Sequence, residues 1–297
     1  IRALLERERA PSSWRATPAR RLVSSEEHMR RVERCREFIA AGDVYQANLA
    51  YRMLSNVEGT PEDCYERLRA CNPAPYMAFA DLERGALLSA SPELLLEFDG
   101  RIARTRPIKG TARRNEDPSE DARVRRELLQ SEKDRAELAM IVDLERNDLG
   151  RVCRPGRVWV EGFPSLESYA RVHHLMADVV GEVSSGLDAC DLLVALFPGG
   201  SITGAPKLRS MEVIAEIEGE GRGFYCGSLG FIDTRGQAAF NILIRTGLWR
   251  ARTGGGELGF RVGGGITWLS SPPLEDAETL AKARGWTDVL AGTGVVA

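Results

Sequence analysis

The chain has 297 residues, of which 43% are hydrophobic and 28% are charged, and its formal net charge is -3. This composition is typical of a globular protein and lacks the basic excess of nucleic-acid-binding domains. The sequence also lacks an apolar run long enough to cross a membrane and a signal-peptide pattern, so we expect a cytoplasmic protein that binds neither nucleic acid nor membrane.

The first predicted helix covers residues 24–42. Ser24 and Glu27 have the spacing of a capping box, apolar residues recur at helical spacing after them, and Gly42 ends the helix. A β-rich stretch follows over residues 43–54.

The next predicted elements are a short helix and a set of strands. Thr60-Pro61 opens the helix and Asn72-Pro73 closes it. Strands follow from residue 76 to residue 108, with Asp99-Gly100 as the turn of a hairpin.

The second half of the chain mixes helices and strands. Residues 117–120 cap one helix, and a second helix covers residues 131–150. A Gly/Pro loop separates the predicted helices of residues 187–197 and 208–219. Strands are expected over residues 157–162, 169–183, 223–233, 237–249 and 258–269, and a last helix begins after Ser270-Ser271-Pro272.

The order of these elements indicates the fold class. Strands and helices do not alternate strictly, and the sequence shows no repeat, low-complexity linker or clear domain boundary. We therefore predict an α+β fold with large antiparallel sheets.

The cysteines and histidines limit the possible metal chemistry. Six cysteines occur without a CxxC pair, which is typical of reduced thiols in the cytoplasm. The chain has three histidines, which nearly excludes a histidine-rich zinc site. Any metal would be bound by carboxylate oxygens, which favours a hard cation such as magnesium.

Two of the predicted helices carry acidic residues on one face. Asp134 and Glu137 are three residues apart, and Glu275, Glu278 and Lys282 lie at positions i, i+3 and i+7. The two faces could meet across a cleft and bind a magnesium ion. Spacing alone favours the simpler interpretation of two solvated amphipathic surfaces.

The loop "PGGSITGAPK", residues 198–207, has glycine spacing close to that of a phosphate-binding P-loop. Ala205-Pro206 interrupts the motif, and no Ser or Thr follows Lys207, so a nucleotide P-loop is excluded. What remains is a glycine loop that leads into a helix with Pro206 at its first position. Such a helix start either attracts an anion or is purely structural.

Four polar residues lie in predicted apolar strands. A histidine in such a strand, like His174, is most often a core residue. Glu93 is either an exposed edge residue or, if buried, a carboxyl group of raised pKa that could act as a general acid. Tyr225 and Arg245 each lie in an apolar strand, and a buried arginine needs an anionic partner.

Lys109, in "RTRPIKGTARR", is the main candidate for covalent chemistry. A lysine becomes nucleophilic when desolvation or nearby cations lower its pKa from about 10.4. Arg104 and Arg106 are the candidate cations, and Gly110 would let a ligand approach the backbone closely. Taken alone, the residue is more simply a solvent-exposed lysine in a loop.

Together, these segments resemble the chorismate-utilising enzymes from about Ile39 onward. The resemblance implies a two-layer α/β sandwich with large antiparallel sheets inside and helices outside. It is carried by the ordered stretches "GDVYQANLA", "SPE", "RPIKGT", "SEKDRAELAMIVDLERNDLGRV", "VHHLMADVVGEV", "FPGGSITGAPK", "FYCGSLGFID", "NILIRT", "GGGI" and "EDAETLAKARG".

The resemblance also implies a metal site and a substrate site. Glu137 and Glu278 are expected as direct magnesium ligands, and Asp134 and Glu275 as residues that act partly through water. The carboxylates of chorismate are then bound by side chains or backbone of Tyr225, Arg245, Lys282, Gly110, Thr111, Gly204, Ala205 and Gly264.

The residue at position 109 indicates the subfamily. Within this family, anthranilate synthases usually have Pro-Ile-Ala-Gly-Thr, whereas aminodeoxychorismate synthases have the lysine. The implied reaction is covalent: Lys109 adds to C2 of chorismate, Glu93 protonates the departing C4 hydroxyl and His174 lies near the ring. Ammonia then adds at C4, which gives 4-amino-4-deoxychorismate for p-aminobenzoate and folate biosynthesis.

The source of ammonia is expected to lie outside this chain. No cysteine has the setting of a glutaminase nucleophile, so a glutamine amidotransferase subunit, in a heterodimer, or a further domain should supply it. Residues 1–23 are expected to be a remnant of the family's amino-terminal segment or a linker, and residues 24–297 the chorismate-binding catalytic domain. The alternatives are anthranilate synthase component I, another chorismate-utilising enzyme, or a non-catalytic regulatory subunit of the same fold.

Overall fold

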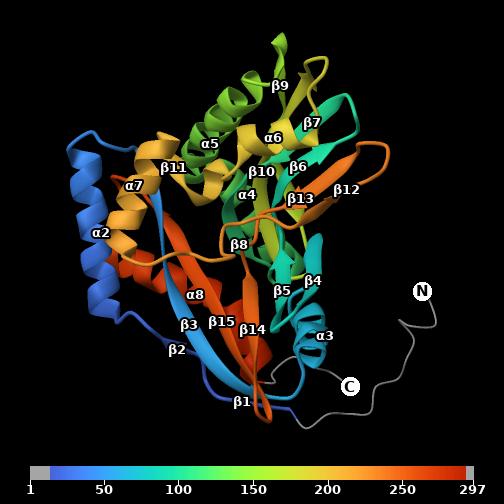
Figure 1. Ribbon diagram of the computed structural model, residues 1–297. Coiled ribbons are helices and arrows are strands. Elements are labelled where there is room, and N and C mark those ends of the chain that lie inside the picture. The colour runs from blue at the N-terminus through green and yellow to red at the C-terminus, as the bar shows by residue number, and fades with distance from the viewer. Residues whose placement is uncertain (1–13, 292–297) are drawn as a thin grey trace.

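The computed structural model describes residues 14–291 and has two large, mainly antiparallel sheets flanked by helices (Figure 1). One sheet has eight strands and the other has seven. The predicted α+β class, with sheets inside and helices outside, is therefore confirmed.

The eight-stranded sheet is built on its longest strand, β3 (Gln46–Glu58). β3 pairs along its whole length with β15 (Gly255–Ile266), in a register that places Tyr51 opposite Val262. The strand order is β1-β3-β15-β14-β5-β4, with β2 and β11 also paired to β3. The other strands are β1 (Arg15–Ala16), β2 (Arg20–Arg21), β4 (Tyr76–Leu82), β5 (Gly85–Ser91), β11 (Gly204–Ala205) and β14 (Thr246–Arg252).

The seven-stranded sheet has the order β12-β13-β6-β7-β10-β8, with β9 also paired to β10. The expected hairpin is present, because Asp99-Gly100 joins β6 and β7 and Gly100 has a φ of 100°. Its strands are β6 (Leu94–Phe98), β7 (Ile102–Arg106), β8 (Ile108–Arg113), β9 (Cys153–Ser168), β10 (Val172–Val183), β12 (Gly230–Ile232) and β13 (Ala238–Asn241).

The helices begin where the sequence places polar caps. Thr60 and Asp117 each accept backbone N–H groups of the following turn, and a proline follows each of them. Ser24 also caps its helix, but Glu27 pairs with Arg30 and Arg31, so the reciprocal half of the expected capping box is not formed. The helices are α2 (Ser25–Ala40), α3 (Pro61–Cys71), α4 (Pro118–Gln130), α5 (Glu132–Gly150), α6 (Ala189–Leu196), α7 (Lys207–Glu218) and α8 (Pro272–Ala291).

Each sheet packs its apolar side chains against its own set of helices. α5 lies on β9 and β10 of the seven-stranded sheet, whereas α7 packs on β3 and α8 on β15 of the other sheet (Figure 1). α2 and α7 lie side by side and share a third cluster of buried residues with β3. Within residues 14–291, no helix is both long and apolar enough to span a membrane.

Two predicted strands are interrupted, and both interruptions affect candidate site residues. Residues 223–226 form a turn and residues 227–229 are irregular, so only β12 remains of the strand expected over 223–233. The strand expected over 237–249 divides into β13 and β14, because the chain passes from one sheet to the other. Tyr225 and Arg245 therefore lie in irregular backbone, and their placement in apolar strands was wrong.

Two further predictions concern the amino-terminal segment and the first residue of α7. β1 and β2, within the segment expected to be a remnant or linker, pair with β3, and the boundary at residue 24 stays a prediction. The first 13 residues of that segment and residues 292–297 lie outside the described part of the chain. Pro206 is the N-cap of α7 and not its first helical residue, because its ψ of 142° is extended.

A buried carboxyl group lies between α5 and β7. Glu145 is 2% exposed, and its Oε2 accepts a hydrogen bond from Thr105 Oγ1 at 3.0 Å. Burial, reinforced by the negative charge of Glu93, raises the pKa of Glu145 to about 8. The folded protein therefore keeps this carboxyl protonated at a pH at which the unfolded chain has lost the proton.

This difference predicts a pH-dependent stability. The folded state retains the proton of Glu145 between its unfolded pKa near 4.5 and its folded pKa of about 8, so the free energy of unfolding should fall as pH rises through this window. The loss should be on the order of 1 kcal/mol per pH unit. Glu145→Gln should remove this component, as measured by chemical denaturation at pH 6 and pH 8.

Asp143→Asn is the matched control, because Asp143 is exposed on the same helix. It should leave the pH dependence of the wild type in place. An identical pH dependence in Glu145→Gln and wild type would contradict the assignment of Glu145.

Candidate active site

Lys109 lies on β8, where the two sheets approach each other. Its Nζ donates a hydrogen bond to the carbonyl oxygen of Ser201 at 3.2 Å. A Cβ atom at Gly265, on β15 of the other sheet, would lie 3.5 Å from the same Nζ. Desolvation lowers the pKa of Lys109; Glu137 opposes this effect and Lys282 adds to it. The pKa of Lys109 is therefore shifted in the expected direction, and the interpretation as a solvent-exposed loop lysine is wrong, because the residue lies in β8 and is half-buried.

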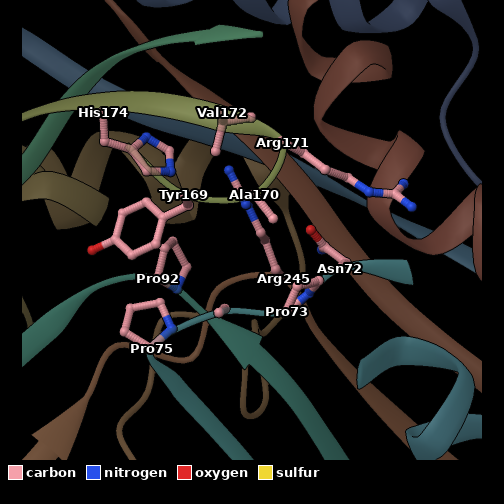
Figure 2. A pocket seen from close by; sticks show the side chains of 11 residues that line it. Asn72, Pro73, Pro75, Pro92, Tyr169, Ala170, Arg171, Val172, His174 and Arg245 are labelled. Carbon is pink, nitrogen blue, oxygen red and sulfur yellow. The ribbon is translucent and has the colours of Figure 1, made fainter. Parts of the chain in front are cut away.

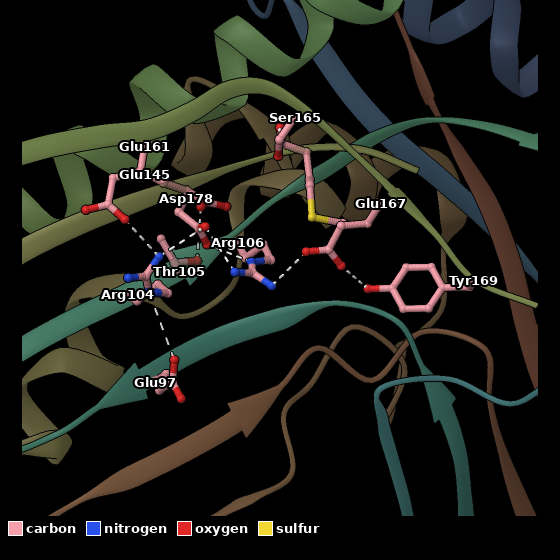
Figure 3. A network of polar contacts seen from close by, with 11 residues as sticks. Glu97, Arg104, Thr105, Arg106, Glu145, Glu161, Ser165, Glu167, Tyr169 and Asp178 are labelled. Carbon is pink, nitrogen blue, oxygen red and sulfur yellow. Dashed lines mark hydrogen bonds and ion pairs between the residues drawn. The ribbon is translucent and has the colours of Figure 1, made fainter. Parts of the chain in front are cut away.

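Arg104 and Arg106 do not supply the positive charge near Lys109. Both project from β7 to a network on the sheet surface, where each pairs with Asp178 (Figure 3). Arg104 also contacts Glu161, and Arg106 also contacts Glu167. The sequence suggested them because they are close along the chain, but their side chains are neutralised elsewhere.

Glu93 is a buried carboxyl group at the turn between β5 and β6. It is 3% exposed, and its Oε1 accepts the backbone N–H of Ile108 at 3.3 Å. Burial raises its pKa, while the positive charges of Lys109 and Arg245 act in the opposite direction. The structure thus supports the buried alternative for Glu93 over the exposed one, in a position adjacent to Lys109.

Asp134 and Glu137 lie in the first turns of α5, next to β8. A Cβ atom at Gly110 would lie 3.0 Å from the Cβ of Asp134, and Gly110 has a φ of 81°. Glycine therefore allows α5 to approach the strand that carries Lys109. Burial raises the pKa of Glu137, and Lys109 and Lys133 oppose the shift.

Glu275, Glu278 and Lys282 lie along one side of α8, as the spacing predicted. Ser270 Oγ donates to Glu275 Oε1 at 2.7 Å, and Lys282 Nζ contacts Glu278 Oε1 at 2.9 Å. Lys282 Nζ also donates to the carbonyl oxygen of Gly263 at 3.2 Å. A Cβ atom at Gly264 would lie within 3.5 Å of both Lys282 Nζ and Glu275 Oε2, so β15 forms the floor of this half of the site.

The acidic residues of α5 and α8 fit a divalent cation by their chemistry. The negative charge of Glu278 is among the influences that raise the pKa of Glu137, so the two carboxylates are within electrostatic reach. Within residues 14–291, no three carboxylate, histidine or cysteine side chains already converge as a metal cluster. Lys133 instead contacts Glu137, and Lys282 contacts Glu278. Both ion pairs would have to break before the glutamates could bind a metal ion. All four acids supply the oxygen ligands that magnesium prefers.

His174 and Thr111 face each other across β10 and β8. The His174 Nδ1 and Thr111 Oγ1 atoms are 2.9 Å apart, and His174 Nε2 is buried without a hydrogen-bond partner among the described residues. Burial, with a contribution from Arg245, lowers the pKa of His174 to about 3, so its ring is neutral. His174, Tyr169 and Arg245 line one pocket, together with Pro92 (Figure 2).

Arg245 is the clearest anion-binding group of this pocket. Its φ of 49° is rare for a residue with a side chain. Across residues 14–291, its guanidinium forms no hydrogen bond or ion pair, and burial lowers its pKa while the charge of Glu93 acts in the opposite direction. Such unused, partly desolvated charge at a strained backbone position points to a ligand. Tyr225, in the turn before β12, is half-buried, and burial raises its pKa well above 10.

Gly204 and Ala205 form β11 and lie directly against β3. A Cβ atom at Gly204 would lie 2.0 Å from the carbonyl oxygen of Gln46, so only glycine can occupy this position. Ser201, in the same loop, provides the carbonyl that Lys109 contacts. The glycine loop thus closes one wall of the Lys109 site.

Two polar residues of this region were missed by the sequence interpretation. Both side-chain amide atoms of Gln46 are buried and lack hydrogen-bond partners among residues 14–291, and the same holds for Asn48 Nδ2. A Cβ atom at Gly265 would lie 2.8 Å from Gln46 Nε2 and 3.5 Å from Lys109 Nζ, so the amide lies beside the lysine. The signal was a glutamine and an asparagine in an otherwise apolar strand, where their amides need polar partners.

Comparisons with known proteins agree with this geometry. Residues 3–288 match the sequence profile of the family described as chorismate binding enzyme. The chain is 47% identical over 255 residues to anthranilate synthase component 1 of Streptomyces coelicolor, covering 86% of this chain and 49% of that protein. It is 44% identical over 252 residues to aminodeoxychorismate synthase component 1 of Bacillus subtilis, covering 85% and 53%.

The fold is also shared with solved structures. The crystal structure of anthranilate synthase component I from Streptococcus pneumoniae superposes with a TM-score of 0.84 and 34% sequence identity, covering 96% of this chain and 64% of that one. The chain spans about half the length of the curated relatives it matches. Both synthase names occur among the relatives, so the comparisons do not distinguish their products.

The lowered pKa of Lys109 predicts a distinct pH profile for its chemical modification. Cyanate is small and reacts with the neutral amine, so carbamylation of Lys109 should begin at a lower pH than carbamylation of Lys133, which is exposed on α5. Peptide mass mapping between pH 6 and pH 9 measures both sites in one sample. The same pH profile at both lysines would contradict a desolvated Lys109.

Proposed function

Because the chain belongs to the chorismate-binding enzyme family, we propose that it converts chorismate and ammonia to 4-amino-4-deoxychorismate, as aminodeoxychorismate synthase component I does. The observation that carries this proposal is Lys109, a desolvated amine beside the buried carboxyl of Glu93. The family resemblance associates a lysine at this position with amination at C4.

The opposed shifts of the two pKa values favour the reactive protonation states. Burial lowers the pKa of Lys109 and raises that of Glu93, so each group is driven towards its neutral form. A neutral amine can attack carbon, and a neutral carboxyl can protonate a leaving oxygen. An ordinary exposed lysine would carry a proton at neutral pH and could not attack.

In the first step, the Lys109 nitrogen forms a bond to C2 of chorismate while the ring double bonds shift and the C4–O bond breaks. The departing oxygen takes the proton of Glu93 and leaves as water. The proton now in excess on the Lys109 nitrogen passes to the Glu93 carboxylate, which restores the acid.

In the second step, ammonia adds at C4, the double bonds shift back and the C2–N bond breaks. Glu93 protonates the departing lysine nitrogen and then accepts the proton released by the new ammonium group at C4. Glu93 thus donates one proton and takes one back in each of the two steps, and Lys109 returns to its neutral state. Blocking C2 with Lys109 directs ammonia to C4.

The remaining site residues hold the substrate in this proposal. Arg245, which forms no hydrogen bond or ion pair with the described residues, would bind one carboxylate, and the Tyr225 hydroxyl would donate to it. Glu137 and Glu278, assisted by Asp134 and Glu275, would hold magnesium. Bound there, the ion would neutralise the ring carboxylate and polarise the ring for loss of the C4 hydroxyl.

The backbone and Lys282 complete the substrate site. Gly264 leaves space beside Lys282 Nζ, and the Gly110-Thr111 step lies next to Lys109 on β8. Lys282 now contacts Glu278 and the Gly263 carbonyl, so it would bind a substrate carboxylate after leaving these partners. His174, neutral and with a free Nε2, would contact the ring.

Ammonia is proposed to come from a glutamine amidotransferase subunit or domain. The similar proteins are named as component 1, which is a name for one part of a two-component system. We propose a heterodimer with such a partner in the cytoplasm, supplying p-aminobenzoate for folate. Free ammonium should replace the partner in an assay.

A second candidate is anthranilate synthase component I. It is favoured by the names of several relatives, including one that is 47% identical. Its product requires amination at C2 and loss of pyruvate, which a lysine bound at C2 would obstruct. Lys109 therefore favours the first candidate.

The reaction product tests the proposal directly. With chorismate, magnesium and ammonium, the protein should form 4-amino-4-deoxychorismate without release of pyruvate, as identified by mass spectrometry. Lys109→Ala and Lys109→Arg should both lose this activity, because neither supplies a neutral amine, and Glu93→Gln should lower it by at least about 10²-fold.

The variants separate charge from nucleophilicity. Lys109→Arg keeps a positive charge at this position, so full activity in this variant would contradict the covalent role. Anthranilate and pyruvate as products of the wild type would support the second candidate and refute the first.

A further inference from the structure

Asp276 links the first turns of α8, the helix that carries Glu275 and Glu278, to β2 and α2. This residue follows Glu275 directly, and it lies two positions before Glu278 in the first turns of α8. Successive residues of a helix point about 100° apart, so Asp276 projects away from the face that carries the two glutamates. It is 8% exposed and points into the interior between α8 and α2.

The Asp276 carboxylate accepts four hydrogen bonds from three residues. Arg21 contacts both of its oxygens, at 2.7 Å and 3.3 Å. Ser25 Oγ donates to Oδ2 at 2.8 Å, and His28 Nδ1 lies 2.9 Å from Oδ1. These partners come from β2 and α2, elements about 250 residues earlier in the chain.

The partners of Asp276 are themselves fixed by Tyr51 on β3. The Arg21 guanidinium lies 4.4 Å from the centre of the Tyr51 ring, and the His28 ring meets Tyr51 edge-on at 4.9 Å. His28 is 1% exposed and Tyr51 is fully buried. Asp276 and its partners therefore connect α8 to β3, the longest strand of the eight-stranded sheet.

The segment before α8 contributes one buried side-chain contact, in which Ser270 Oγ donates to Glu275 Oε1 at 2.7 Å, but its apolar residues are exposed. Trp268 and Leu269 are 57% and 77% exposed, and Leu274 in the first turn is 70% exposed. Most of the polar contacts of this turn with other elements lie on its inner side, where Asp276 meets β2 and α2. The bidentate contact of Arg21 and the two further hydrogen bonds fix the plane of the Asp276 carboxylate. They therefore define the rotation and the height of the first turn of α8.

We propose that Asp276, held by Arg21, Ser25 and His28, is a positioning residue that sets where Glu275 and Glu278 stand relative to Glu137 across the site. The inference rests on the proposed function, since it assumes that these glutamates bind a divalent cation. Asp276 does not touch the cation. It acts by fixing the helix from which two of the ligands project.

The test uses Mn²⁺ as a paramagnetic substitute for magnesium. Asp276→Asn keeps the shape of the side chain but weakens its contacts with Arg21, so the first turn of α8 should lose its fixed position. Electron paramagnetic resonance titration of the full chain should show Mn²⁺ affinity reduced by about tenfold, the lower end of what removal of supporting contacts costs a metal site.

A matched control separates positioning from general destabilisation. Asp178 also pairs with two arginines, but on β10 of the other sheet. Asp178→Asn should lower the midpoint of thermal unfolding without changing Mn²⁺ affinity. Should Asp276→Asn fail to fold, Arg21→Lys gives a milder change, because it keeps the charge and loses the bidentate contact.

The outcomes distinguish the two levels of the proposal. Unchanged Mn²⁺ affinity in a folded Asp276→Asn or Arg21→Lys, with normal binding by the wild type, would overturn the positioning role and leave the proposed function intact. Absence of Mn²⁺ binding by the wild type would refute the metal site itself and the inference with it. Reduced affinity in Asp276→Asn, with unchanged affinity in Asp178→Asn, supports the inference.

Discussion

The desolvation of Lys109 is the constraint on which the rest of the site depends. An amine removed from water favours its neutral form; here its hydrogen bond goes to the Ser201 carbonyl, and the desolvation of Lys109 outweighs the opposing charge of Glu137. The environment that gives this result requires β8 of one sheet to lie against β15 of the other. The same low-polarity environment raises the pKa of Glu93, so one physical cause prepares both groups.

The arginines around the site differ in whether they are paired with an acid. Cations that are needed for stability are paired on the surface, as Arg104 and Arg106 are with Asp178. Arg245 instead remains unpaired and half-buried at a strained backbone position. An unpaired, desolvated cation at a strained backbone position costs stability, which is consistent with the proposed role of Arg245 in binding a ligand carboxylate.

The sequence predicted features whose causes are local along the chain. Thr60-Pro61, Asp117-Pro118 and the Asp99-Gly100 hairpin lie where expected, because caps and tight turns depend on a few neighbouring residues. The acidic faces of α5 and α8 were also visible from helical spacing. The family resemblance then indicated which polar residues belong together, which spacing alone could not do.

Features that depend on contacts between distant segments were missed or misplaced. Nothing near Arg245 in the sequence indicates that the chain changes sheets there, and nothing near Glu145 indicates that it faces Thr105 rather than water. Arg106 was assigned to Lys109 because only three positions separate them, yet alternation along β7 and the Asp178 contact direct it to the opposite surface.

The site is assembled from two halves that are joined by sheet packing. α5 belongs to the seven-stranded sheet and α8 to the eight-stranded sheet, so the acids they carry can converge only if both sheets hold a fixed relative position. At the contact, Gly265 of β15 lies against Lys109 of the other sheet, because a Cβ atom at Gly265 would lie 3.5 Å from Lys109 Nζ. The desolvation of Lys109 therefore depends on the close packing of the two sheets. Any change that separates the sheets should return the lysine to its ordinary, protonated state.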